Sequence, residues 1–144
     1  MSSSDDFSGR DLYGLQCCLR DFDILLERWK KECSDLAVRY SVIKSFELTY
    51  QMAVKTLTKY LQSNSRRADE VANFDFQDVI RLADQEGLLQ DGWPKWKVYR
   101  ENRNRAAHMY REEIANAVSA TLVDFSTDAH ALFNELTRRI ERHG

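Results

Sequence analysis

The sequence contains very few residues that interrupt a helix. One of its 144 residues is proline, Pro94, and five are glycine. Proline and glycine are the strongest local breaks in helical structure, so most of this chain can form long helices. The sequence lacks the apolar–polar alternation of a half-buried strand, the Asn-Gly signal of a hairpin and any internal repeat. It therefore predicts an all-helical protein.

The spacing of apolar residues locates the helices. These residues recur at steps of three and four, which places them on one face of a helix. Asp35 or Ser34 can cap one helix, Gly87 can end another, and Pro94 suits a first helical turn. We expect helices over 11–32, 36–61 and 75–86, from Pro94 into the segment that follows, and over 111–142 with a bend in 119–127; the polar connection 62–73 has room for a short turn. Together they predict one antiparallel four- to five-helix bundle over residues 1–144, with 1–9 flexible.

The cysteines and the hydropathy indicate where the protein works. The sequence has an odd number of cysteines, Cys17, Cys18 and Cys33. They form no CxxC pair, and no secretory signal precedes them. We expect reduced thiols in a cytoplasmic protein. No apolar run approaches the ~20 residues that a membrane-spanning helix requires, so we expect no membrane association of that kind.

Positive charge is concentrated in one stretch. The net charge is −2, but residues 93–111 carry six basic side chains opposed only by Glu101. Such a run is usually a solvated helix face, and its alternative role is to contact a nucleic-acid backbone. The candidates for contacts with RNA phosphates are Lys95, Lys97, Arg100 and Arg105.

A short segment within this stretch combines an arginine, an asparagine, a histidine and a tyrosine. If the helix continues through it, Arg103 falls on the same stripe as Trp96 and Tyr110, where the pattern calls for an apolar side chain. Such an arginine needs a carboxylate, a phosphate or an open cleft. Arg103 and His108 are five residues apart, about 140° around a straight helix. Either the helix opens near residues 106–107, or two chains contribute to one cleft.

These side chains suit phosphate chemistry. The forked guanidinium of Arg103 can bind phosphoryl oxygens, and a histidine such as His108 can move protons near neutral pH. Asn104 can orient His108 or donate to an oxygen. The alternative is an ordinary helix end, with the arginine ion-paired and the other two capping or solvated. His130 and His143 have no comparable neighbours, and we expect no catalytic role for them.

The segment resembles the signature of the HEPN family, Arg-x(4–6)-His with asparagine after the arginine. Arg103, His108 and Tyr110 also satisfy the longer form Arg-x4-His-x-Tyr. Residues 46–61 and 78–89 look like the second and third helices of the HEPN subfamily of nucleotidyltransferase substrate-binding proteins, so the resemblance covers roughly 7–141. The chain departs from the subfamily at two places. Members often carry an acidic residue where Gln51 stands, and often one directly after the tyrosine, where this chain has Arg111.

The resemblance implies a function and its partners. It implies a homodimer in which both Arg–His pairs face one cleft, and a toxin that cleaves RNA without a metal or other cofactor. Arg103, Asn104 and His108 would be catalytic, and no Asp/Glu cluster lies near enough in sequence for a two-metal mechanism. A partner nucleotidyltransferase antitoxin, called MNT, would transfer adenosine monophosphate from ATP to Tyr110.

Several alternatives remain open from the sequence. The chain could instead be a non-catalytic substrate-binding or partner subunit of the nucleotidyltransferase, or a helical scaffold whose basic groove binds acidic peptides. Trp93, Trp96 and Tyr99 either anchor the dimer or pack in the core of one chain. Tyr110 either faces solvent or packs its ring beneath the last helix.

Overall fold

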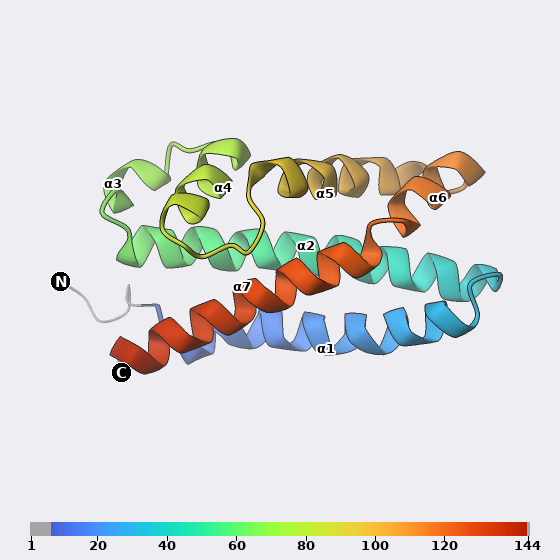
Figure 1. The fold of residues 1–144 in the computed structure, drawn as a ribbon, viewed down its shortest axis with the longest axis horizontal. Coiled ribbons are helices and arrows are strands. Elements are labelled where there is room, and N and C mark those ends of the chain that lie inside the picture. Colours follow the sequence, from blue (N-terminus) through green and yellow to red (C-terminus); the bar gives the residue numbers. More distant parts are fainter. Residues whose placement is uncertain (1–6, 144) are drawn as a thin grey trace.

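The computed structural model describes residues 7–143, and their secondary structure is entirely helical (Figure 1). The order is α1 (Gly9–Lys31), α2 (Leu36–Asn64), α3 (Ala68–Val71), α4 (Phe76–Gln85), α5 (Trp93–Arg105), the 3₁₀ helix η2 (Ala106–His108), α6 (Glu112–Ser119) and α7 (Leu122–His143). Helices α1 and α2 run antiparallel, α5 lies along α2 on the side away from α1, and α7 crosses both α1 and α2. The predicted antiparallel helical bundle is confirmed.

Helix boundaries follow from caps that the sequence supplies. The side chains of Ser8 and Asp11 form a capping box, and α1 therefore begins at Gly9, two residues before the predicted start. Of the segment 1–9 expected to be flexible, residues 1–6 lie outside the described residues. Ser8 is the N-cap of α1, Gly9 is its first residue, and Phe7 directly precedes the cap. The ring of Phe7 meets that of Tyr60 edge-on at 5.3 Å. Asp35 caps α2 through the backbone N–H groups of the first turn.

A tight connection sets the direction of α5. Gly87 ends α4 with φ +75°, a conformation that favours glycine because it has no Cβ. The next two residues, Leu88 and Leu89, are buried, which returns the chain to the core. Helix α5 then starts after Gly92, with Pro94 in its first turn as predicted.

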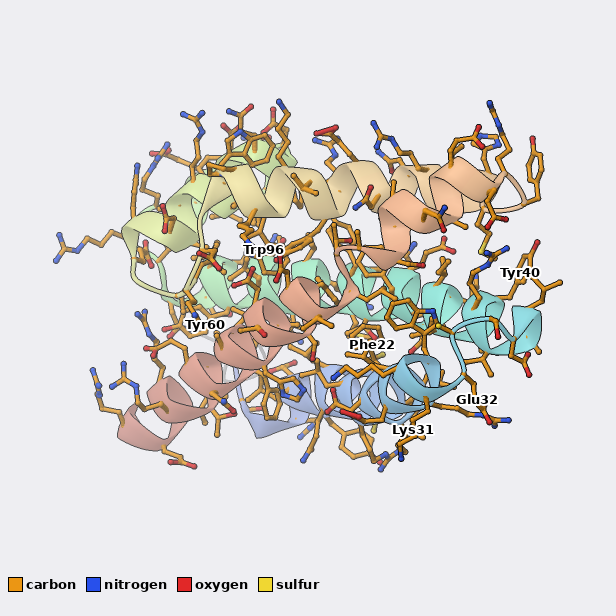
Figure 2. The ribbon with its side chains drawn as sticks, turned by 45° about the vertical axis from the view of Figure 1, so that its right-hand side comes forward. Phe22, Lys31, Glu32, Tyr40, Tyr60 and Trp96 are labelled. Atoms are coloured by element: carbon orange, nitrogen blue, oxygen red, sulfur yellow. The ribbon has the colours of Figure 1, made fainter. Side chains whose placement is uncertain are left out.

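The core is centred on aromatic rings from four helices. Phe125 of α7 is fully buried and meets Phe22 of α1 and Phe46 of α2 edge-on, with ring centroids 5.8 and 5.0 Å apart. Trp96 and Tyr99 of α5 contact the same ring. Figure 2 shows Phe22 and Trp96 pointing into the space between the helices. This cluster fixes α5 against the other long helices.

The predicted interruption of the last helical region is present. Helix α6 ends at Ser119 and α7 begins at Leu122. The hydroxyl of Thr121 donates to the backbone carbonyl of Val118 at 2.9 Å, which satisfies one of the carbonyls left free at the helix end. None of the described helices combines the length and the apolar character needed to span a bilayer.

Candidate functional site

Helix α5, which leads into the arginine–histidine segment, is tied to α7 by polar contacts. The Tyr99 hydroxyl donates to Oδ2 of Asp128 at 2.5 Å, in a buried position. Burial, together with neighbouring Asp91, raises the pKa of the Asp128 carboxyl to about 6, even though the hydrogen bond from Tyr99 opposes the rise. Asn102 donates to Oγ1 of Thr121 at 3.0 Å. These contacts hold the C-terminal half of α5 in a fixed rotation.

That rotation corrects one expectation about the buried stripe. The polar side chain on the core face is Asn102, which is 3% exposed, and Arg103 is only half-buried beside it. Trp96 and Tyr99 lie wholly inside the core of one chain, so they are not available as dimer anchors. The third candidate anchor, Trp93, is half-buried and packs against the ring of Phe76. Core packing is therefore the correct alternative for Trp96 and Tyr99.

The α-helix ends between the arginine and the histidine. Helix α5 ends at Arg105, and residues 106–108 form η2. The N–H of Met109 bonds to the carbonyl of Ala106 at 3.2 Å, a three-residue step in place of the four-residue step of an α-helix. The α-helical spacing therefore stops between Arg103 and His108, and no contact joins these two side chains in the described part of the chain.

The guanidinium of Arg103 is held by two neutral amides. In the orientation that satisfies both groups, Oε1 of Gln51 accepts from Nε of Arg103 at 3.2 Å and also from Nη2. Nη1 of Arg103 donates to Oδ1 of the neighbouring Asn104 at 3.3 Å. Thus the amide of Asn104 contacts the arginine, and no hydrogen bond joins it to His108 within the described part of the chain.

His108 and Tyr110 lie next to one another at the outer surface. Their rings meet edge-on with centroids 6.2 Å apart and planes at 73°. Tyr110 is 71% exposed, so its ring does not pack beneath the last helix. The N–H of Arg111 bonds to the carbonyl of His108, and Arg111 pairs with Glu113 at 2.8 Å. Both rings of the segment are therefore accessible to a large ligand or to an enzyme.

The four basic side chains expected to contact RNA differ in their exposure and in their partners. Lys97 and Arg105 are exposed, and Arg100 lies over the ring of Phe76 at 5.0 Å. Lys95 is turned toward α7 and pairs with Asp124 at 2.9 Å, so its charge is already compensated. Lys97 and Arg100 share a face of α5 with Asn104, because they are spaced by three and four residues.

An open groove adjoins this segment on the side of α2. It has a volume of about 540 Å³, and Met109, the residue between the histidine and the tyrosine, forms part of its wall. Its apolar lining includes Tyr40, which is 39% exposed, and Leu48, which is 50% exposed. Tyr40 projects from the outside of the bundle in Figure 2. Asp21 and Lys44 place one charge of each sign at the groove.

In the structure, His130 has a partner that the sequence alone does not predict. Both carboxylate oxygens of Asp23, on α1, lie 2.9 Å from Nε2 of this histidine on α7. The two residues are 107 positions apart, so no local pattern could have paired them. Among the residues that the structure describes, no cluster of three or more His, Cys, Asp or Glu side chains is arranged to hold a metal ion.

Comparison with known proteins agrees with this fold. Residues 10–138 match the family described as nucleotidyltransferase substrate binding protein like. A Haemophilus influenzae protein named probable ribonuclease HepT is 34% identical over 97 residues, which cover 67% of this chain and 66%, or just under two thirds, of that protein. A solved Haemophilus influenzae structure, described as the fold of a substrate binding domain of a nucleotidyltransferase, matches with a TM-score of 0.80 and 25% identity, over 88% of this chain and 98% of that one.

Proposed function

The chain belongs to the nucleotidyltransferase substrate-binding family of HEPN proteins, and from this premise we propose that it is a toxin-type ribonuclease that works without a metal ion. One observation supports this most directly. An exposed histidine lies just beyond the end of an α-helix, and an arginine on the last turn of that helix is neutralised by no carboxylate within the described residues. An intact pair of this kind has no evident use in a purely structural subunit.

The proposed reaction is a transfer within the RNA chain. His108 takes the proton from a ribose 2′-hydroxyl, and the 2′-oxygen attacks the adjacent phosphorus. Arg103 stabilises the added negative charge on the pentavalent phosphate, and Asn104 holds the arginine in place. The bond from phosphorus to the 5′-oxygen then breaks, and the leaving oxygen takes a proton from an acid. The products are a 2′,3′-cyclic phosphate and a 5′-hydroxyl end. Lys97, Arg100 and Arg105 would follow the RNA backbone.

The first test is cleavage in the presence of a chelator. Purified protein should cut single-stranded RNA at the same rate with and without EDTA, because every group in the proposed reaction is a side chain. The new 3′ ends should be 2′,3′-cyclic phosphates, which cannot be ligated until the ring has been opened and the phosphate has been removed. Loss of activity in EDTA, or ends that carry a 3′-hydroxyl, would contradict this mechanism.

The reaction needs both a base and an acid, and a second copy of the chain would supply the second histidine. The groove lined by Tyr40, Leu48 and Met109 is a suitable contact surface, since it is apolar and touches the arginine–histidine segment. A two-fold contact pairs each surface with itself, so the opposite charges of Asp21 and Lys44 can meet across it. We propose that two copies join at this face and bring their two segments into one cleft.

Replacing Leu48 with lysine should therefore weaken the dimer. The side chain is half exposed in one chain, so the change should leave the fold intact while placing a charge in an apolar contact. Sedimentation velocity should show a monomer at concentrations where the unchanged protein is a dimer, with loss of cleavage. Ile24→Lys is the matched control, because Ile24 is 63% exposed on α1 and lies outside this groove. A Leu48 variant that remains dimeric would place the interface elsewhere.

Regulation by a nucleotidyltransferase completes the proposal. Tyr110 is exposed and stands two residues from the histidine, so a partner enzyme can reach its hydroxyl. Transfer of adenosine monophosphate to this oxygen would place negative charge and bulk at the mouth of the cleft and exclude an RNA phosphate. The partner would thereby act as the antitoxin of an MNT type.

A second candidate function is a non-catalytic partner subunit. The solved structure described as a substrate binding domain of a nucleotidyltransferase favours it. Under that function, His108 would be dispensable for binding the nucleotidyltransferase, and the purified chain would leave RNA intact.

A further inference from the structure

The contact between Gln51 and Arg103 joins two helices that are far apart in sequence. Gln51 lies on α2 and Arg103 on α5, and the amide oxygen faces both Nε and Nη2 of the guanidinium. Nη1 of Arg103 donates a hydrogen bond to the side-chain oxygen of Asn104. Among the described residues, no carboxylate lies within ion-pair distance of this arginine. Seven other arginines do pair with an acid: Arg20, Arg28, Arg39, Arg67, Arg111, Arg138 and Arg139. Arg103 is thus oriented by neutral groups.

A neutral partner leaves the positive charge of Arg103 in place, whereas a charged partner cancels it. A carboxylate would form a charge-assisted pair with the fork and cancel the positive charge that a phosphate should meet. An amide oxygen accepts the same N–H groups and leaves the full charge on the guanidinium. It also leaves part of the fork free for a second oxygen ligand. Arg103 therefore combines a fixed direction with an uncompensated charge, and both properties depend on the side chain at position 51.

We propose that Gln51 is a positioning residue that aims Arg103 at the reacting phosphate without neutralising it. This inference rests on the proposed ribonuclease function and extends it to a residue on another helix. The amide itself touches no reacting atom. Its removal should change how well the phosphate is stabilised in the transition state, and a change to a carboxylate should also change how well the phosphate binds.

Two variants separate these effects. Gln51→Met keeps a similar length but has no acceptor, so Arg103 loses its direction and retains its charge. We expect kcat to fall about tenfold, with KM for RNA nearly unchanged. Gln51→Glu has the same shape and adds a carboxylate, so Arg103 keeps its direction while part of its charge is cancelled. KM for RNA should then rise several-fold, with kcat nearly unchanged. Gln62→Glu is the matched control, because it makes the same change at an exposed position on the same helix and should leave both constants unchanged.

A measurement that does not need activity keeps this inference distinct from the ribonuclease proposal. The Nε–H of Arg103, followed by nitrogen-15 NMR, should exchange slowly with water in the unchanged protein and rapidly in Gln51→Met. Titration with inorganic phosphate should shift this signal, at several-fold higher concentration in Gln51→Glu. Unchanged exchange in Gln51→Met, or an unchanged phosphate titration in Gln51→Glu, would overturn the role of Gln51. If those signals behave as expected but the unchanged protein does not cleave RNA, only the ribonuclease proposal is wrong.

Discussion

Replacing His108 with alanine should abolish RNA cleavage while leaving the fold unchanged. A positioned acid or base contributes about a hundred- to ten-thousandfold to a rate, and the proposed reaction uses this histidine for proton transfer. The ring is exposed, and among the residues that the structure describes it contacts the ring of Tyr110 edge-on. Loss of an exposed side chain of this kind changes the free energy of unfolding by about 0.5 kcal/mol or less. Cleavage rates and thermal unfolding of the same sample measure both effects.

The matched control for this variant is His130→Ala. That histidine is also partly exposed, but it pairs with Asp23 on α1, in a different groove of the bundle. Its replacement should leave cleavage intact. Arg103→Ala should be as inactive as the His108 variant, and Asn104→Ala should retain more activity, because its amide acts through the arginine. Cleavage that persists without His108 would point to a contaminating nuclease or to another site in this protein.

Incubation with its nucleotidyltransferase and ATP should silence the nuclease. In the expected reaction, the Tyr110 oxygen attacks the α-phosphorus of ATP, pyrophosphate leaves, and a base of the partner takes the phenol proton. Intact mass spectrometry should show the addition of adenosine monophosphate, with cleavage reduced in proportion to the modified fraction. The large expected effect follows from the location, because the added phosphate lies beside the histidine that RNA must reach.

Tyr110→Phe should remain an active nuclease that the partner can no longer modify. Tyr13→Phe serves as its control, since Tyr13 is 66% exposed on α1 and should leave modification unchanged. A mass increase that persists in Tyr110→Phe would assign the modified residue elsewhere. A modified protein that still cleaves RNA at the full rate would separate the transfer from any control of the nuclease.

Local patterns predicted most of the fold because helix caps and breaks are encoded in neighbouring residues. Helix α2 begins at Leu36 after the Asp35 cap, as expected, and Gly87 ends the turn after α4. The misjudged boundaries have local causes as well. The capping box at Ser8 extends α1 by two residues, and α2 continues to Asn64 because nothing in its polar last turn prevents a helix.

The site was less predictable because its contacts cross the bundle. Periodicity alone could not decide whether Asn102 or Arg103 occupies the core stripe, since the two differ by one helical position. Asn102 occupies the core stripe because its side chain can donate a hydrogen bond to Thr121 there. The contact of Gln51 with Arg103 likewise depends on how α2 and α5 pack. The end of the α-helix before residues 106–108 was the exception, because the angle between arginine and histidine on a straight helix already favoured a break there or a second chain.

The antiparallel order of the long helices separates the two ends of the described chain from the arginine–histidine segment. Helix α1 begins and α7 ends at one end of the bundle, whereas η2 and α6 lie at the other (Figure 1). Helix α2, which runs between these ends, has 29 residues and is therefore about 43 Å long. A reporter or an affinity handle fused before α1 or after α7 would be attached at the end of the bundle opposite to His108. Such a tether can anchor the protein to a surface while RNA, a second copy or a modifying enzyme approaches from the opposite end.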